Sequence, residues 1–216
     1  VAQYCETLYG LQDQLNITLG GTESIGNLLL GNTLALLREQ MPCQKNEEGG
    51  EEGQDAEDED EADHDEIIMD NVADLIGQLA KTLKGDFEPL FKELFPDIIK
   101  YANRSSYTDK AMALGCVAEV IANIGPAAVN YSEAILEHIV KGLSNDMEMV
   151  RRNAVYCLGV LIESTGDQLV AHFMTILEAL APLCARSADQ QTTDAGGADV
   201  DNALAALARM INVDKT

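Results

Sequence analysis

A motif that ends in glycine recurs along this 216-residue chain and constrains its fold more than any other feature. The segments DNVADLIGQLAKTLKG, KAMALGCVAEVIANIG and RRNAVYCLGVLIESTG end at Gly85, Gly125 and Gly166, which are 40 and 41 residues apart. When the glycines are aligned, an alanine falls twelve positions before each of them and an apolar residue falls five positions before. The alanines are Ala73, Ala113 and Ala154, and the apolar residues are Ala80, Val120 and Leu161. A repeat of about forty residues therefore organises the chain.

A fourth copy begins at DNALAALARMI, where Ala203 matches the alanines and Met210 the later apolar position. Each copy after the first follows another segment with helical apolar spacing, and no segment shows the sustained alternation of a strand. Two antiparallel helices in about forty residues are typical of HEAT and armadillo repeats. We predict an all-α HEAT-repeat solenoid of stacked helix pairs, since one pair cannot bury its apolar face alone. A plain helical bundle is the alternative, which the regular alanine register disfavours.

This register also predicts where the repeats begin and end. Residues 1–21 would end a preceding repeat, and further repeats would span 22–85, 86–125, 126–166 and 167–216, the last of them truncated. Insertions at 44–66 and 187–199 would fall between the two helices of the first and last of these repeats, so both would project from one side of the solenoid. The chain opens with Val and stops within a helical pattern, so we expect it to be part of a longer protein.

Several residues have the character of helix caps. Ser106 stands three positions before Asp109, as in a capping box, and Asn145 or Asp146 is a candidate N-cap for the helix that follows. The repeated glycines suit the left-handed conformation just after a helix end.

The insertion at 44–66 carries a dense run of negative charge. Thirteen of the 22 residues from Glu47 to Ile68 are acidic and none is Lys or Arg, in a chain whose net charge is −23. We predict a disordered, self-repelling loop that attracts a basic partner; a merely solvated loop is the alternative. The residues assigned to this acidic attractor are Glu57, Asp58, Glu59, Asp60 and Glu61. The net charge disfavours nucleic acid and anionic membranes and favours a basic protein surface.

Neither the cysteines nor the histidines predict a catalytic or metal site. Five cysteines without tight spacing argue against a disulfide framework and for reduced thiols in the cytosol or nucleus. Cys116 and Cys157 lie in apolar helical runs, where a thiol packs as a small hydrophobe. No phosphate loop, nucleophile elbow, zinc motif, signal peptide or long apolar span occurs in the sequence. We therefore expect no enzyme activity, no cofactor and no metal site.

A helical wheel of the second helix of each repeat separates an apolar arc from an arc of small residues. This second arc contains Gly115, Ala118, Ala122 and Gly159, and small residues there would leave room for an extended chain. A carboxylate could pair with lysine, and an asparagine could hold a peptide backbone. The candidate binding residues are Glu119, Asn153, Tyr156, Asn202 and Asp74. The alternative is that these are ordinary solvated side chains. The basic residues Arg151, Arg152 and Lys110 are expected to bond neighbouring loops.

Several motifs resemble the C-terminal HEAT repeats of the importin-β superfamily. They are PCQ before the acidic tract, then IIMDNVADLIGQLAKTL, PLFKELFPDIIKYANRSS, MALGCVAEVI, VRRNAVYCLGVL and DNALAALARMI. The resemblance implies a receptor that shuttles between cytoplasm and nucleus and imports basic cargo such as core histones and ribosomal proteins. It also implies that the full-length receptor interacts with nucleoporins and with Ran-GTP, the latter mainly through N-terminal repeats.

In that family the C-terminal arch binds lysine-rich signals on its inner helices. The resemblance places Glu119, Tyr156 and Asn202 among the lysine-binding positions. An alternative function is a HEAT scaffold that organises a regulatory or phosphatase complex without specificity for basic peptides.

Overall fold

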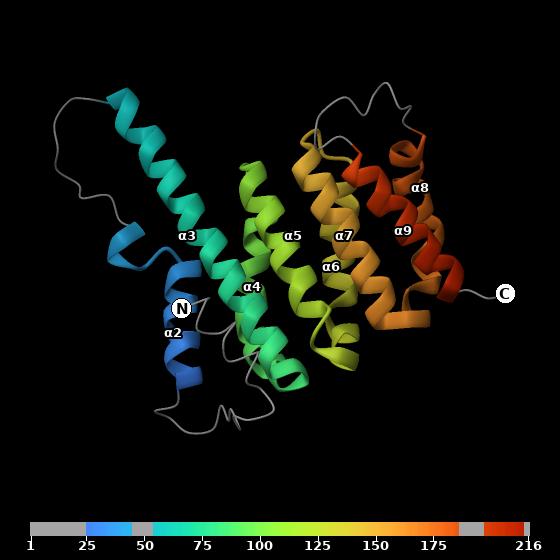
Figure 1. The fold of residues 1–216 in the computed structure, drawn as a ribbon, viewed down its shortest axis with the longest axis horizontal. Coiled ribbons are helices and arrows are strands. Elements are labelled where there is room, and N and C mark those ends of the chain that lie inside the picture. Colours follow the sequence, from blue (N-terminus) through green and yellow to red (C-terminus); the bar gives the residue numbers. More distant parts are fainter. Residues whose placement is uncertain (1–24, 45–53, 186–196, 214–216) are drawn as a thin grey trace.

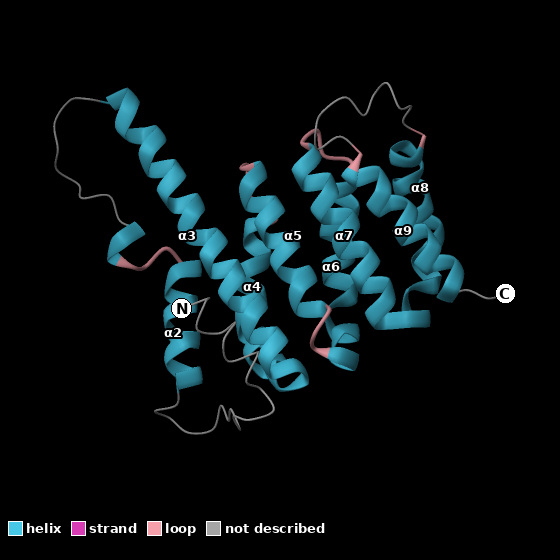
Figure 2. Cartoon of the chain, in the orientation of Figure 1, coloured by secondary structure: helices cyan, strands magenta, loops and turns pink. Residues whose placement is uncertain are grey.

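The structure is a computed structural model that describes residues 25–44, 54–185 and 197–213. All regular elements in these ranges are helices, drawn in cyan in Figure 2. The α-helices are α2 (Ile25–Leu37), α3 (Gln54–Leu83), α4 (Glu88–Tyr101), α5 (Tyr107–Ile121), α6 (Ser132–Leu143), α7 (Glu148–Thr165), α8 (Phe173–Cys184) and α9 (Ala198–Val213). Short 3-10 helices lie at Pro42–Gln44, Lys84–Phe87, Gly125–Tyr131 and Gly166–His172. None of the helices within the described ranges is long and apolar enough to cross a membrane.

The helices alternate between two layers. Figure 1 shows α3, α5, α7 and α9 side by side in the front layer, with α2, α4, α6 and α8 behind them. Each front helix packs against its neighbours in that layer, and the back helices cover its inner side. This arrangement confirms the predicted all-α HEAT solenoid of antiparallel helix pairs. The proposed repeat limits stay a prediction.

The residues that mark the repeat lie in the core. Ala113, Ala154 and Ala203 are completely buried. Ala154 faces α6, where a Cβ on Gly142 would lie 2.8 Å from the Ala154 Cβ, and a small side chain lets two helices approach closely. The later apolar positions are also buried, at Ala80, Val120, Leu161 and Met210. Ala73 is only partly buried, and in the described part of the chain α3 has a front-layer neighbour on one side alone, α5.

The helix ends agree in part with the predicted caps. The Ser106 Oγ accepts a hydrogen bond from the Asp109 backbone N–H at 3.2 Å, as predicted. The predicted N-cap at Asn145 or Asp146 is wrong, because Met147 is the N-cap of α7; the Asn145 Oδ1 instead accepts a hydrogen bond from the Met147 N–H at 2.9 Å. Gly125 and Gly166 adopt the predicted left-handed φ values of 63° and 60°. The same prediction is wrong for Gly85, because Lys84 takes the positive φ of 52° where α3 gives way to a 3-10 helix.

The acidic insertion is shorter than predicted. The expected disordered loop at 44–66 is wrong for residues 54–66, which form the start of the 30-residue helix α3. Glu57, Asp58, Glu59, Asp60 and Glu61 therefore lie on a helix, while residues 45–53 lie outside the described residues. Of the predicted insertion at 187–199, residues 187–196 also lie outside them, and residues 198 and 199 belong to α9, where the predicted loop is wrong. Three effects favour the helix at 54–66. Glu and Ala are good helix formers, and negative charge near a helix N-terminus interacts favourably with the helix dipole. Elongating a helix already anchored by packing at 67–83 avoids a new nucleus.

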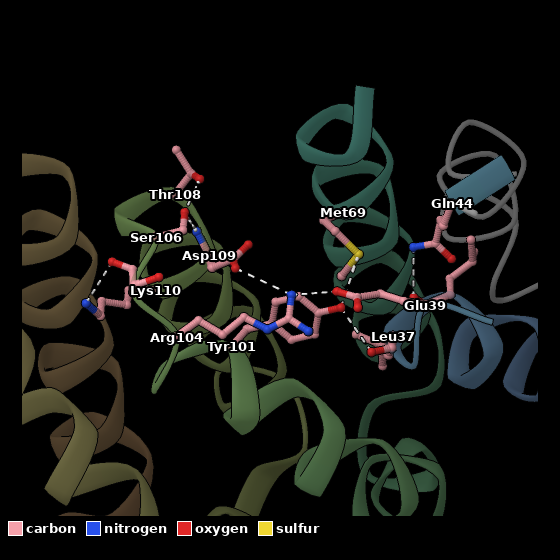
Figure 3. A network of polar contacts seen from close by, with 12 residues as sticks. Leu37, Glu39, Gln44, Met69, Tyr101, Arg104, Ser106, Thr108, Asp109 and Lys110 are labelled. Atoms are coloured by element: carbon pink, nitrogen blue, oxygen red, sulfur yellow. Dashed lines mark hydrogen bonds and ion pairs between the residues drawn. The ribbon is translucent and has the colours of Figure 1, made fainter. Parts of the chain in front are cut away.

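A polar joint connects the first two helix pairs (Figure 3). The buried Tyr101 hydroxyl donates to the Leu37 carbonyl at 3.0 Å and so ties α4 to the end of α2. The Arg104 guanidinium lies 3.9 Å from the centre of the Tyr101 ring and pairs with Glu39 at 2.6 Å. Burial raises the pKa of Tyr101 to about 12, so its hydroxyl stays a donor throughout the neutral range. These contacts fix the spacing of the two pairs at one edge of the solenoid.

The two cysteines predicted to pack as hydrophobes do so. Cys116 in α5 and Cys157 in α7 are buried, with exposed fractions of 4% and 0%. Burial raises the pKa of each thiol to about 12. Both side chains are therefore neutral parts of the core.

The tight contact between α6 and α7 predicts opposite effects for two glycine substitutions. A Cβ on Gly142 would lie 2.8 Å from the Ala154 Cβ, whereas a Cβ on Gly31 in α2 would meet nothing within 4 Å. We expect Gly142→Ala to lower the free energy of unfolding by about 1–3 kcal/mol through overpacking. Gly31→Ala should raise it by up to about 1 kcal/mol through helix propensity. Urea unfolding followed by circular dichroism measures both, and equal effects of the two substitutions would contradict the packing described here.

Candidate binding face

The outer side of the front layer carries a chain of polar contacts across three helices. Lys81 in α3 forms an ion pair with Glu119 in α5, with 3.0 Å between Nζ and Oε2. From the other side the Tyr156 hydroxyl of α7 donates to the Glu119 Oε1 at 3.3 Å. The Lys81 and Glu119 side chains are each 36% exposed, so water and ligands reach the pair. Burial and then the Glu119 charge raise the pKa of Tyr156, which keeps its hydroxyl protonated as the donor.

Asp74 belongs to the same neighbourhood. It lies exposed on α3, two turns before Lys81. Burial is the main cause of the raised pKa of Cys116, and the negative charges of Glu119 and Asp74 add to it, so both carboxylates lie near this thiol. Asp70, one turn earlier on α3, has its pKa raised by burial and by the charge of Asp74. Asp70, Asp74 and Glu119 together make this region negative.

The two predicted asparagines make equivalent contacts between neighbouring second helices. The Asn153 Nδ2 in α7 donates to the Ala111 carbonyl of α5 at 2.7 Å. The Asn202 Nδ2 in α9 donates to the Arg152 carbonyl of α7 at 3.4 Å. In each case the acceptor residue comes directly before the residue that aligns with the asparagine in the preceding repeat. These amide groups therefore link adjacent repeats, and the structure separates Asn202 from Glu119 by the whole of α7.

Three glycines on this face accommodate side chains of the next repeat. A Cβ on Gly77 would lie 3.4 Å from the Glu119 Cβ, and a Cβ on Gly115 would lie 3.4 Å from the Asn153 Nδ2. A Cβ on Gly159 would lie 3.2 Å from an Arg209 guanidinium nitrogen. From the sequence, we expected Gly115 and Gly159 to leave space for an extended ligand. In the structure their open sides face Asn153 and Arg209 of this chain.

Two basic residues that the sequence reading missed lie on the face. Lys81 holds Glu119, and Arg209 in α9 pairs with Glu163 in α7, with 3.0 Å between Nε and Oε2. Arg209 occupies the repeat position that Glu119 occupies in α5, with the opposite charge. Extending the aligned fourth copy to its end would have located Arg209. Nothing in a single-helix wheel indicates the Lys81–Glu119 pair.

The basic residues near the helix starts bond to loops, as predicted for two of them. Arg151 donates from Nη1 to the carbonyls of Asn145 and Asp146 at 2.8 and 2.6 Å. Its Nε also pairs with the buried carboxylate of Asp199, at 2.8 Å, and so joins α7 to the start of α9. Lys110 donates to the Ser105 carbonyl at 3.3 Å. These contacts hold the edge of the solenoid in place.

The acidic attractor is separate from Glu119 but lies on the same helix as Asp74 and Lys81. Residues 57–61 precede Asp74 by 13 to 17 positions on α3, which corresponds to about 20–25 Å along the helix. Figure 1 shows the start of α3 projecting beyond α2 and α5. One continuous helix thus runs from the attractor to the Glu119 neighbourhood.

Comparison with known proteins identifies the class of this solenoid. The family described as "Importin subunit beta-1-like, TPR repeats" matches residues 60–203. The probable importin subunit beta-4 of Schizosaccharomyces pombe is 28% identical over 155 residues, covering 72% of this chain and 14% of that protein. Human importin-4 is 30% identical over 190 residues, covering 87% of this chain and 17% of that protein. The chain therefore spans less than a fifth of the length of these curated relatives.

Solved structures show the same fold. The karyopherin Kap121p bound to the SUMO protease Ulp1p superposes with a TM-score of 0.69 at 16% identity, covering 99% of this chain and 19% of that one. A multiple mutant of Kap121p gives a TM-score of 0.72 at 16% identity, covering 98% and 19%. The chain belongs to the importin-β family, as its motifs predicted, and forms a segment of that family's HEAT-repeat solenoid.

The asparagine contacts predict a stability effect that a purely ligand-binding residue would not show. Asn153→Ala removes a 2.7 Å inter-repeat hydrogen bond and should lower the free energy of unfolding by about 1 kcal/mol. Asn202→Ala removes a longer bond, of 3.4 Å, and should cost less. Urea titration of both variants measures the difference. If Asn153→Ala leaves stability unchanged, the amide is free to serve a ligand.

Proposed function

We propose that this chain is the part of a nuclear import receptor that binds a lysine-rich segment of basic cargo. Membership of the importin-β family supports a general role as a nuclear transport receptor. The observation that carries the finer proposal is the contact between Glu119 and Lys81. Glu119 already holds a lysine ammonium at 3.0 Å on an accessible face. A lysine from a cargo peptide would need a carboxylate that is accessible in the same way.

The residues around Glu119 suit a lysine side chain. Tyr156 is 41% exposed and its hydroxyl already contacts Glu119, so its ring can cover the aliphatic part of an incoming lysine. Asp74 and Asp70 add negative charge along α3. Asn153 and Asn202 serve the proposed site by fixing the spacing between helices. Core histones and ribosomal proteins are the proposed cargo class, with shuttling between cytoplasm and nucleus. Ran-GTP and nucleoporins would act through other parts of the full-length receptor.

In the proposed binding, a cargo lysine replaces Lys81 as the ion-pair partner of Glu119. A cargo lysine gains Glu119 only when the Lys81 ammonium leaves it, so the net gain is the difference between two similar ion pairs. Lys81 would then weaken binding of single lysines. A lysine-rich segment would still bind, because it offers several ammonium groups to several carboxylates.

The acidic start of α3 would act before this exchange. Charge complementarity raises the rate of encounter more than it slows dissociation. Residues 57–61 stand on the helix that also carries Asp74 and Lys81, so a basic chain drawn to them would lie close to the proposed site.

A specific observation favours the alternative of a scaffold without basic-peptide specificity. Glu119 and Glu163 are both paired within the chain, with Lys81 and Arg209. The Asn153 and Asn202 amides are also used between repeats. A face whose polar groups are satisfied internally could serve only to hold the solenoid together. The following substitutions distinguish the two functions.

Exchange at Glu119 predicts opposite effects for the two members of the ion pair. Glu119→Gln should weaken binding of a lysine-rich histone-tail peptide by about 0.5–2 kcal/mol, and Lys81→Gln should strengthen it several-fold by freeing the carboxylate. Glu93→Gln and Lys92→Gln on the exposed side of α4 are matched controls, because they change the net charge equally. Isothermal titration calorimetry measures the affinities. If each variant differs no more than its control, the scaffold function is favoured.

The attractor predicts an effect on association rate. Replacing Glu57, Asp58, Glu59, Asp60 and Glu61 by the corresponding amides should slow association of a labelled histone tail about tenfold at low salt. Dissociation should change little, and the difference should shrink as salt rises, since the screening length is about 8 Å at physiological ionic strength. Stopped-flow binding at several salt concentrations measures both rates, and circular dichroism checks that the helix persists.

The control for this experiment neutralises the same number of charges elsewhere. Exposed carboxylates away from the face are Asp86, Glu93, Asp146, Asp167 and Glu178. A several-fold faster dissociation at every salt concentration would instead show that the tract contacts the peptide directly. Identical rates in both variants would show that only net charge matters.

A further inference from the structure

A pocket at one edge of this acidic chain is lined by basic side chains and by no acidic one. It has a volume of about 250 Å³ and lies where the end of α4 and the start of α5 meet the end of α6 and the start of α7. Its basic lining residues are Arg104, Lys110, His138 and Lys141. The amide side chains of Asn103 and Asn145 also line it. The net charge of the chain is −23, so a basic lining here is opposite in sign to the molecule as a whole.

The basic side chains of this pocket differ in how strongly other groups of the chain bind them. Figure 3 shows the Arg104 guanidinium directed toward Glu39, away from Lys110. It pairs with Glu39 at 2.6 Å and with Asp109 at 3.6 Å. Among the described residues, the Lys110 ammonium contacts only the Ser105 carbonyl, at a long 3.3 Å. Lys141 pairs with Glu137 at 2.7 Å in an arrangement that leaves both side chains more than 60% exposed, and such surface pairs are weak. Lys110 and Lys141 can therefore turn to a ligand.

His138 supplies the most specific feature. Its Nδ1 atom is buried and has no hydrogen-bond partner among the described residues. Burial lowers the pKa of His138, the charge of Lys141 lowers it further, and the charge of Glu137 opposes these effects. The ring is thus kept neutral beside the Lys141 ammonium, and its buried nitrogen lacks the partner that such atoms normally have. An anion in the pocket would place negative charge beside the ring and so favour its protonation.

We propose that this pocket binds a phosphate monoester. A phosphate dianion has several oxygens that accept charge-assisted hydrogen bonds, and it can use donors arriving from different directions. Lys110 from α5, and His138 and Lys141 from α6, surround one space. The volume leaves room for the carbon that carries the phosphate. A long polyanion is disfavoured, because the net charge of the chain repels it beyond the immediate pocket. This proposal does not depend on the binding of basic cargo.

The test follows the titration of His138 by proton NMR, since the chain has three histidines. His138→Gln assigns the resonance. Inorganic phosphate should raise the titration midpoint of His138 by about one pH unit relative to chloride at the same ionic strength. The midpoint of His172, which lies outside the pocket, should stay unchanged. A short phosphoserine peptide should produce the same shift at lower concentration if the natural ligand is a phosphorylated protein, and at higher concentration if it is the free ion.

The double variant Lys110→Gln/Lys141→Gln should abolish the phosphate-dependent shift, while Lys92→Gln, a control on α4, should retain it. Urea unfolding of the double variant checks that the fold persists. The proposal is overturned if phosphate and chloride give the same midpoint in the unsubstituted chain. It is also overturned if the double variant, still folded, keeps the shift.

Discussion

Close packing of the second helices is the contact on which the rest of the structure depends. At these contacts Gly77, Gly115 and Gly159 face side chains of the next second helix, and a larger residue would push the helices apart. The polar contacts of the outer face span this short distance. Asn153 reaches the Ala111 carbonyl, and Glu119 reaches both Lys81 and Tyr156, because neighbouring backbones are close. These glycines thus help to determine which polar groups can meet on the surface.

The same side chains therefore serve the fold and the proposed site. Glu119 links α3, α5 and α7 through Lys81 and Tyr156, and it is also the carboxylate at the centre of the proposed site. Removing Glu119 would weaken a surface link as well as a ligand contact, although links between exposed groups contribute little to stability. The asparagines contribute more to the fold than to a ligand. This difference between Glu119 and the asparagines explains why only some of the predicted binding residues lie together.

The fold could be predicted well from the sequence because the residues that recur in the repeat are buried ones. The aligned alanines and the later apolar residues are the core of each pair, and two of the three aligned glycines adopt the left-handed conformation. Contacts between repeats were not predictable from a wheel, which treats one helix at a time. Lys81, Arg209 and the partners of Asn153 depend on the distance between helices. The acidic tract was misjudged because counting like charges neglected the packed segment at 67–83, which anchors the helix and lets it extend.

The acidic start of α3 has a mechanical consequence. Positions 57 and 61 are about one helical turn apart and both acidic, and like charges at that spacing weaken a helix. A bound polycation would remove this repulsion. If a basic segment bound there, as proposed, the projecting part of α3 would become a stiffer helix, and its amide hydrogens would exchange more slowly.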